Sequence, residues 1–269
     1  MSKVSTNILL YRRAVKITVS DKEKIKKAAE MIKNSRYAVC LTGAGVSTDS
    51  GIQDFRTPGK GLWSKVDPME VTSIQAFQEN PARFYQFYRS RIEELQYVSP
   101  NKAHISLDNL EEAGYLKFLI TQNIDGLHQK AGSRRVLEIH GNLNQAICYK
   151  CGKRISSQLL LKKLDENSDK VPYCRCGSVF KPDVVLFGET LCELDQAIDE
   201  ASKADLFLVA GSSLQVSPAN MLPEYSLAHK GSLIIINYMN THLDNNADLV
   251  VHQNIGEFLS EVCKYLNII

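Results

Sequence analysis

The sequence lacks several features that would define other classes of protein. None of its apolar runs approaches the roughly 20 residues that a membrane-spanning helix needs. The first 20 residues are basic but contain no long apolar segment of the secretory type. The net charge is only +2, with acidic and basic residues interspersed, so no strong field favours a nucleic acid or a membrane surface. The sequence therefore predicts a globular protein, with the cytoplasm as its expected location.

Cysteine is present in an odd number, and its distribution argues against a disulfide framework. The chain has seven cysteines, four of them clustered. Without an export signal, such a cluster favours a metal. Cys148 and Cys151 have the spacing of a zinc knuckle, whereas Cys174 and Cys176 are separated by one residue instead of two. Four thiolates would complete the coordination sphere of one structural Zn²⁺. Two alternatives are that Cys192 replaces one of these ligands, or that the cysteines form a redox dithiol.

Most of the chain alternates between strand-like and helix-like segments. Strand-like runs lie at 37–41, 116–121, 136–140, 184–187, 206–210, 233–237 and 249–251. Helical patterns lie near 102–113, 217–229 and 256–266. Ser20 and Glu23 have the spacing of a capping box, and Ser217-Pro218 that of a helix start. The alternation predicts an α/β fold, a Rossmann-like doubly wound parallel sheet with helices on both faces.

Two stretches interrupt this alternation. Residues 67–99 are helical and rich in aromatic side chains, and residues 146–182 carry the clustered cysteines. A chain of 269 residues can form one large and one small domain, so we expect both stretches to be insertions that build a smaller helical and zinc-binding module. The Rossmann-like domain would then comprise 20–66, 100–145 and 183–269, with 1–19 as an N-terminal extension.

A glycine-rich turn follows the first strand-like run. Residues 43–52 read Gly-Ala-Gly-Val-Ser-Thr-Asp-Ser-Gly-Ile. Closely spaced glycines allow backbone N–H groups to approach a phosphate without interference from Cβ atoms. A short Gly-x-Gly after a strand also occurs in ordinary tight turns, so the motif predicts a nucleotide site only in combination with others.

Polar residues follow three other predicted strands. Residues 121–125 follow one apolar run, His140-Gly141 follows the next, and Gly211-Ser212-Ser213 follows a third. Because ligands bind outside the carboxyl ends of the strands in open α/β sheets, we expect these residues to face one crevice. His140 is the best candidate for a general base, since imidazole titrates near pH ~6.5.

In this order the motifs resemble those of the sirtuins, which are NAD-dependent protein-lysine deacylases. The resemblance runs from about residue 35 to the C-terminus and also includes Asp54-Phe55-Arg56. It implies that NAD is consumed as a cosubstrate. The carbonyl oxygen of an acylated lysine would attack the nicotinamide ribose carbon and expel nicotinamide, giving an alkylimidate. His140 would then take a proton from the ribose hydroxyls, so that the acyl group passes to the 2′-hydroxyl of ADP-ribose and free lysine is released.

The resemblance also assigns individual residues. Its catalytic residues correspond to His140 and Asn123. Its NAD contacts correspond to Gly43, Ala44, Gly45, Thr48, Ile52, Phe55, Arg56, Gln122, Asn123, Ile124, Asp125, His140, Gly211, Ser212, Ser213, Asn237, Met239 and Ile255. Two positions depart from the family pattern, since Gln53 stands where proline is usual and Ser212 where threonine is common.

The acyl and peptide subsites are also implied. Tyr88 and Arg91 lie three residues apart and match the Tyr-x-x-Arg of sirtuins that remove succinyl and malonyl groups, in which arginine pairs with the terminal carboxylate. A solvated helix face is the alternative. The acylated protein is expected to pair as a strand between 185–189 and 215–218. The expected contacts include Val185, Phe187, Gly188 and Val216.

The sequence leaves two other functions open. The activated ribose could be captured by another nucleophile, which would make the protein a mono-ADP-ribosyltransferase. Alternatively, the chain could be a noncatalytic NAD-sensing module that binds a partner protein. Basic residues are spread along the chain, which argues against sequence-specific recognition of nucleic acid by the cysteine module. The sequence indicates no particular oligomeric state.

Overall fold

The computed structural model describes residues 19–269 apart from residues 56, 58, 60 and 65. Residues 1–18 of the predicted extension and the predicted NAD contact Arg56 therefore lie outside the described residues. Within the described part of the chain, no helix is long and apolar enough to cross a membrane.

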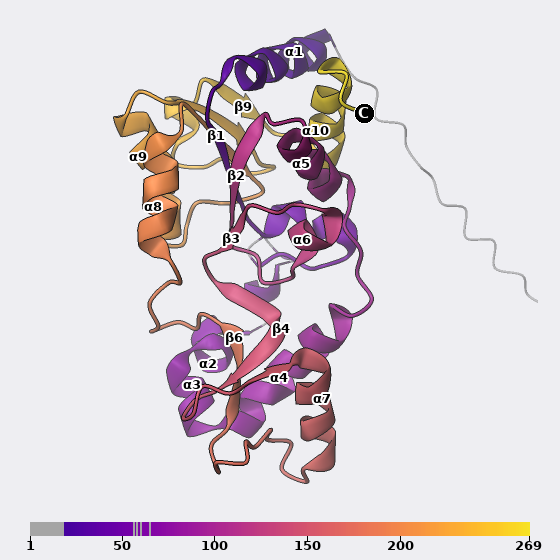
Figure 1. The fold of residues 1–269 in the computed structure, drawn as a ribbon, viewed down its shortest axis with the longest axis vertical. Helices are drawn as coiled ribbons and strands as arrows, with labels where there is room; N and C mark the ends of the chain where they lie inside the picture. Colours follow the sequence, from indigo (N-terminus) through magenta and orange to yellow (C-terminus); the bar gives the residue numbers. More distant parts are fainter. Residues whose placement is uncertain (1–18, 56, 58, 60, 65) are drawn as a thin grey trace, which may run out of the picture.

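In the described residues, a parallel sheet of six strands forms the larger part of the molecule (Figure 1). Its strands are β1 (Ala38–Thr42), β2 (Leu116–Thr121), β3 (Val136–Glu138), β7 (Leu206–Ala210), β8 (Ser232–Ile236) and β9 (Leu249–Val251). They lie in the order β3-β2-β1-β7-β8-β9, and every neighbouring pair is parallel. The central strands β1 and β7 consist entirely of buried residues, as expected when helices cover both faces.

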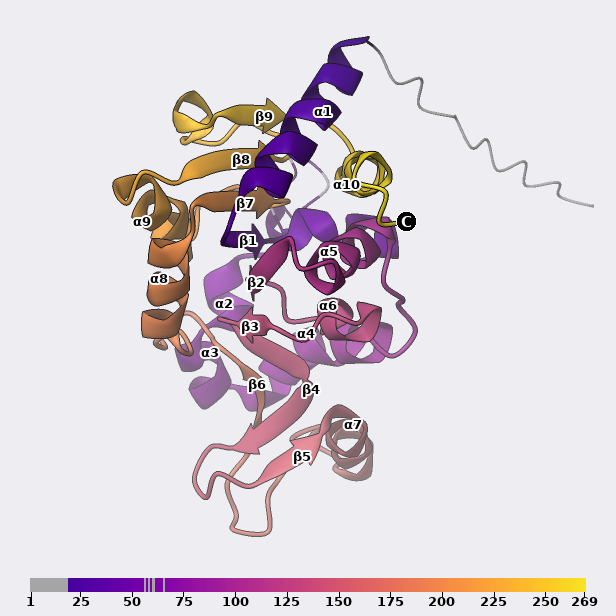
Figure 2. The ribbon, with the colours of Figure 1, turned by 45° about the horizontal axis from the view of Figure 1, so that its top comes forward.

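Helices pack on both faces of this sheet (Figure 2). One face carries α1 (Val19–Asn34), α5 (Lys102–Glu112) and α10 (Ile255–Tyr265), and the other carries α8 (Leu194–Lys203) and α9 (Leu222–Ala228). Each face of the sheet has its own hydrophobic core, and β1 contributes to both. Ala38 and Cys40 pack into the core with α1, α5 and α10, whereas Val39 and Leu41 pack into the core with α8 and α9. The doubly wound class predicted from the sequence is confirmed.

The direction of the winding changes between β1 and β7. The chain proceeds from β1 outward to β2 and β3, and then returns to the other side of β1 to form β7, β8 and β9. In open α/β sheets a ligand binds at such a reversal, beyond the carboxyl ends of the strands. The topology therefore directs attention to the loops that follow β1 and β7.

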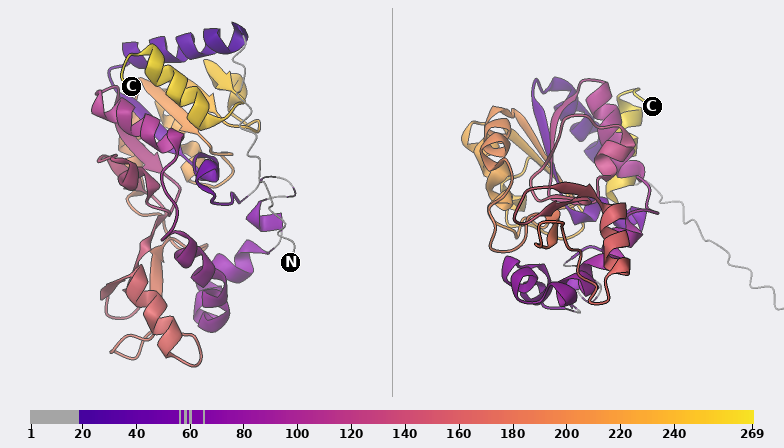
Figure 3. Two further views of the ribbon diagram at one scale, coloured as in Figure 1. Left: turned by 90° about the vertical axis from the view of Figure 1, so that its right-hand side faces the viewer. Right: turned by 60° about the horizontal axis from the view of Figure 1, so that its bottom comes forward.

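A smaller module lies beyond the carboxyl ends of the sheet strands (Figure 3). It contains α2 (Pro68–Thr72), α3 (Ile74–Glu79), α4 (Pro81–Glu94) and α7 (Ser157–Glu166), with an antiparallel sheet of β4 (Gly141–Cys148), β5 (Arg154–Ser156) and β6 (Phe180–Val184). Phe84 from the first insertion and Phe180 from the second belong to one buried core. The two interruptions of the sequence pattern thus fold together, while the domain boundaries stay predictions.

Short segments complete the architecture. They are α6 (Leu127–Ala131) and the 3₁₀ helices η1 (Ala44–Val46), η2 (Thr48–Ser50), η3 (Leu62–Ser64), η4 (Ala219–Met221) and η5 (Asp244–Asn246). The helices η1 and η2 make up most of the glycine-rich turn, so this turn is a folded unit with its own backbone hydrogen bonds rather than an open loop.

Three local predictions are wrong. The run at 184–187 is not a strand, because β6 ends at Val184 and the chain then turns, with Glu189 N–H bonded to the Leu186 carbonyl oxygen. The predicted cap Ser20 lies inside α1, which already includes Val19. The predicted start at Ser217-Pro218 precedes only η4, and α9 begins at Leu222. Pro223 occupies the first turn of that helix, where the missing N–H of proline costs nothing.

Candidate active site

A cavity of about 640 Å³ lies at the reversal of the sheet. Segments that follow β1, β2, β3, β7 and β8 line it, together with α4 and the segment after β6. Every predicted cofactor and substrate contact that the structure describes is among its lining residues. The fold therefore brings together residues that are separated by up to about two hundred positions in the sequence, while their individual roles stay predictions.

The glycine-rich turn packs directly against the loop after β7. Gly43 N–H donates to the Ala210 carbonyl oxygen at 3.0 Å, and Gly45 N–H donates to that of Gly211 at 2.9 Å. A Cβ atom on Gly43 would lie 2.8 Å from the Gly211 oxygen, and one on Gly45 would lie 2.8 Å from the Gly211 Cα. Glycine is thus needed at both positions because the two backbones pack closely. This packing places the glycine-rich turn and the loop after β7 together at the cavity.

A buried hydrogen-bond network fixes the polar residues after β2. The Ser47 hydroxyl donates to Asp125 Oδ2 at 2.7 Å and accepts from Asn123 Nδ2 at 3.1 Å. Asn123 Nδ2 also donates to the Gly43 carbonyl oxygen, and Asp125 Oδ1 accepts from Leu127 N–H at the start of α6. Asn123 and Asp125 are only 7% and 5% exposed, so their orientations are set before any ligand binds.

Two histidines lie behind this network. Asn101 N–H at the start of α5 donates to His104 Nδ1 at 3.3 Å, so Nε2 carries the hydrogen and donates to Ser47 Oγ at 3.3 Å. His128 Nε2 lies 2.9 Å from Thr42 Oγ1. Burial lowers the pKa of His104 to about 4 and that of His128 to about 3, with the neighbouring His104 adding to the second shift. Both rings are neutral at pH 7.

Acidification from pH 7 to pH 5 is expected to lower the free energy of unfolding. Both histidines have folded pKa values below the ordinary 6.5, so the unfolded chain binds more protons over this range and stability is lost as the pH falls. Two such groups give a slope of up to about 3 kcal/mol per pH unit. Urea unfolding at pH 7, 6 and 5 measures it, and His128→Phe should reduce the slope by about half. An unchanged slope in that variant would contradict the assignment.

His140 is oriented by the backbone of the loop after β2. Its Nδ1 lies 2.9 Å from the Gln122 carbonyl oxygen. A carbonyl oxygen only accepts, so Nδ1 carries the hydrogen of the neutral ring and the lone pair is on Nε2. The next residue, Gly141, has a φ of +70°, and a Cβ atom there would lie 2.1 Å from the Asp183 carbonyl oxygen. The sharp turn that presents His140 therefore requires glycine.

Aromatic side chains form one wall of the cavity. Phe55 stacks on Trp63 with ring centroids 5.1 Å apart, and Trp63 stacks on Phe87 of α4 at 6.4 Å. The Arg91 guanidinium lies 3.5 Å above the Phe87 ring, and its Nη1 donates to the Phe87 carbonyl oxygen. Burial raises the pKa of Tyr88 and lowers that of Arg91. Tyr88 is buried and Arg91 half-buried, so the predicted alternative of a solvated helix face does not describe them.

Sequence reasoning missed several residues of this cavity. Ser47 lies within the recognised turn, but its role follows from a buried hydrogen bond to the distant Asp125, which the sequence does not show. The sequence carries no signal for Trp63 and Tyr238 either. Tyr238 is 67% exposed and lies between Asn237 and Met239, which were predicted as NAD contacts.

The four clustered cysteines meet at the far end of the small module. Their sulfur atoms all lie within 4.8 Å of one another, with Cys148 and Cys176 at 3.5 Å and Cys151 and Cys174 at 3.7 Å. A tetrahedral ZnS₄ site with Zn–S bonds of about 2.3 Å has sulfur atoms about 3.8 Å apart. The donor set thus fits zinc. Among the described residues Cys192 does not belong to the group, which removes it as an alternative ligand.

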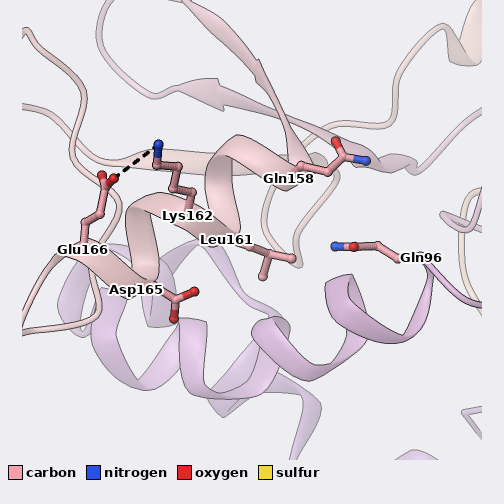
Figure 4. A pocket seen from close by; sticks show the side chains of 6 residues that line it. All are labelled: Gln96, Gln158, Leu161, Lys162, Asp165 and Glu166. Carbon is pink, nitrogen blue, oxygen red and sulfur yellow. Dashed lines mark ion pairs between the residues drawn. The ribbon is translucent and has the colours of Figure 1, made fainter.

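A second hollow, of about 500 Å³, lies on the small module between α7 and the end of α4 (Figure 4). Its lining consists mostly of long polar side chains, and Lys162 and Glu166 form an ion pair of 3.7 Å across one turn of α7. It contains none of the predicted site residues, so the cavity at the sheet reversal is the stronger candidate for the active site.

The fold and cavity define a doubly wound nucleotide-binding type of protein, and comparison with known proteins identifies its family. The sequence pattern of the Sir2 family matches residues 43–218. The chain is 47% identical over 240 residues to an NAD-dependent protein deacetylase of Sulfurisphaera tokodaii, covering 89% of this chain and 95% of that protein. It is 46% identical over 235 residues to NAD-dependent protein deacetylase 1 of Geobacillus kaustophilus, covering 86% and 94%.

Solved structures agree with this result. A Sir2 complex with a p53 peptide and NAD⁺ has a TM-score of 0.84 and 39% identity, covering 91% of this chain and 100% of that one. A Sir2 structure with an acetylated peptide has a TM-score of 0.84 and 38% identity, with the same coverage. The chain belongs to the Sir2 family, the sirtuins.

Proposed function

We propose that this protein is an NAD-dependent protein-lysine deacetylase, which cleaves NAD to nicotinamide and transfers the acyl group to the 2′-hydroxyl of ADP-ribose. The observation that carries the proposal is one cavity lined by His140, by Asn123 and Asp125, and by the glycine turn at Gly43. The deacetylases among its relatives, matched over most of their length, support the same activity.

The cavity suits a dinucleotide. Its volume of about 640 Å³ falls in the usual range of small-molecule sites. Asn123 and Asp125 would hold the nicotinamide carboxamide, because they offer a buried amide and a buried carboxylate in fixed orientations. Ser212, whose hydroxyl accepts from Gln122 Nε2 at 2.8 Å, would lie on the adenosine side with Asn237.

The chain's own residues would perform two tasks during the reaction. When bound, NAD supplies a ribose carbon that parts from nicotinamide and the hydroxyl groups that receive the acyl group. His140 Nε2 would accept the proton of a ribose hydroxyl, since Nδ1 already donates to the Gln122 carbonyl oxygen. Phe55, backed by Trp63, would exclude water from the cleaved bond.

We also propose that the four cysteines hold one structural Zn²⁺. Four thiolates leave no open position for water or substrate, so the ion would take no part in the chemistry. Its contribution would be to the folding of the small module, because Cys148 and Cys174 lie in the same core as Phe84 and Tyr85 of α4.

Removal of acidic acyl groups is a second candidate activity. The observation in its favour is the position of Arg91, whose half-buried guanidinium lines the cavity one helical turn from Tyr88. A carboxylate at the end of a succinyl or malonyl group would find there a cation that is partly removed from water. Acetyl-lysine stays the first expectation.

One mass-spectrometric assay tests both activities. The protein, NAD and acetyl- or succinyl-lysine peptides should give nicotinamide only when an acylated peptide is present, together with free lysine and acylated ADP-ribose. Arg91→Met should lower the succinyl rate relative to the acetyl rate by about tenfold or more. Arg89→Met is the matched control, because that guanidinium pairs with Glu93 on the same helix and with Asp165 of α7, and Arg89 does not line the cavity.

Each other outcome of this assay has a clear meaning. Protein labelled with ADP-ribose would identify the transferase, and NAD binding without release of nicotinamide would identify the sensor. A succinyl-to-acetyl ratio that is the same in Arg91→Met and the unaltered protein would end the proposal for acidic acyl groups.

A further inference from the structure

A buried lysine and a glutamate tie together the segment that follows β6. The Lys181 side chain is 9% exposed, and its Nζ donates to the Val184 carbonyl oxygen at 2.6 Å and to Glu189 Oε2 at 2.9 Å. The same Glu189 oxygen accepts from Leu186 N–H at 2.9 Å. One carboxylate oxygen thus joins the strand to the far end of the turn that follows it.

This turn forms part of the cavity wall next to His140. Residues 185–189 all line the cavity. The first of them, Val185, is bonded to the backbone of His140, because its N–H donates to the His140 carbonyl oxygen at 2.9 Å. Phe187 is bonded through both its N–H and its carbonyl oxygen to the backbone of Thr72 and Ile74. The turn therefore connects the small-module helices to the residue that would accept the proton.

The turn has no regular secondary structure to hold it. β6 ends at Val184, and Gly188 has a φ of +94°, so no strand ladder continues through these residues. Backbone bonds hold Val185 and Phe187, and the Lys181–Glu189 pair, with its bond to Leu186 N–H, adds side-chain bonds between the strand and the turn. The Lys181–Glu189 pair is suited to this, because a buried pair that loses one partner leaves an uncompensated charge and polar groups without bonds.

We propose that Lys181 and Glu189 are positioning residues for the acylated peptide. They hold 185–189 in the form that accepts the peptide backbone, at a fixed place relative to His140. The inference rests on the proposed function, because the peptide is the substrate in question. Neither residue is assigned a role in proton transfer; both act through the shape of the turn.

Lys181→Met is expected to raise the KM for an acetyl-lysine peptide by about tenfold or more, because a misplaced binding segment loses its alignment with the peptide. The kcat at saturating peptide and the affinity for NAD alone should change much less, since the network around Asn123 and Asp125 is untouched. Lys181→Arg, which keeps the charge and the donors, should restore most of the KM.

Two further variants separate positioning from folding. Arg154→Met is the matched control. It removes an ion pair to Asp183, which lies on β6 like Lys181, and it does not alter the bonds of residues 185–189. The double variant Lys181→Met/Glu189→Leu removes both charges, so it avoids a lone buried charge and should fold while the turn stays loose. Hydrogen exchange at the Leu186 and Phe187 amides should rise in Lys181→Met and in the double variant, and not in Arg154→Met.

The outcomes are distinguishable from failure of the proposed function. If no acylated peptide is turned over by the unaltered protein, the proposed function fails, while the exchange measurement still tests the turn. If Lys181→Met is folded and its peptide KM and its exchange rates match those of the unaltered protein, the positioning role is wrong. An equal loss in Arg154→Met would assign the effect to general stability and would also overturn it.

Discussion

His140→Ala should lower the rate of acyl transfer by about a thousandfold, while the fold and the cysteine site are kept. The reason is the tautomer: Nδ1 donates to the Gln122 carbonyl oxygen, so the lone pair on Nε2 would be the acceptor for a ribose proton. Alanine removes that acceptor without disturbing the network of Ser47, Asn123 and Asp125. Single-turnover and steady-state rates with an acetyl-lysine peptide measure the effect.

The matched control is His229→Ala, which removes an exposed imidazole at the C-terminal end of α9, outside the cavity lining. Its rate should equal that of the unaltered protein. Far-ultraviolet circular dichroism should give the same spectrum for both variants, because neither substitution should change the fold. A His140→Ala protein that keeps more than about a tenth of the activity would remove His140 from the role of general base.

Metal analysis should find about one zinc ion per chain, and its removal should unfold the small module. The binding of structural zinc to four thiolates is worth on the order of 10 kcal/mol, comparable to the whole stability of a domain. Because the core around Cys148 and Cys174 includes Tyr88, loss of the metal should also abolish turnover. Chelation followed by hydrogen exchange over α4, α7 and β4–β6 measures the extent of unfolding.

Cys176→Ser and Cys192→Ser form a matched pair for this experiment. Both cysteines are exposed, but only Cys176 belongs to the cluster. Zinc content and the thermal midpoint should fall in the first variant and stay unchanged in the second. Zinc retained by Cys176→Ser, or lost from Cys192→Ser, would contradict the assigned ligand set.

Much of the fold could be predicted because buried parallel strands are mostly apolar. The runs at 116–121, 206–210 and 249–251 match β2, β7 and β9 to the residue, since each strand is bounded by turns. The crevice was predictable for a related reason: polar residues that directly follow buried strands of one parallel sheet must share an edge. These inferences need only local patterns.

The errors arose where distant contacts decide the local structure. The apolar residues 184–187 resemble a strand, but all except Val184 lie in the turn that Lys181 and Glu189 connect to β6, and no periodicity encodes that pair. Ser47 likewise owes its role to Asp125, which lies 78 positions further along the chain. The sequence explained Gly43 only by access to a phosphate. The structure adds that the backbone after β7 occupies the space that a Cβ atom at this position would need.

One strand joins the proposed general base to the first cysteine ligand. β4 begins at Gly141, directly after His140, and ends at Cys148, so its eight residues span about 25 Å. A chimaera that takes the cysteine module from a relative should therefore keep the whole of this strand, including Cys148, from the recipient protein. Junctions placed within β4 would shift the imidazole, whereas junctions in the exposed turn at Lys150 should leave it in place.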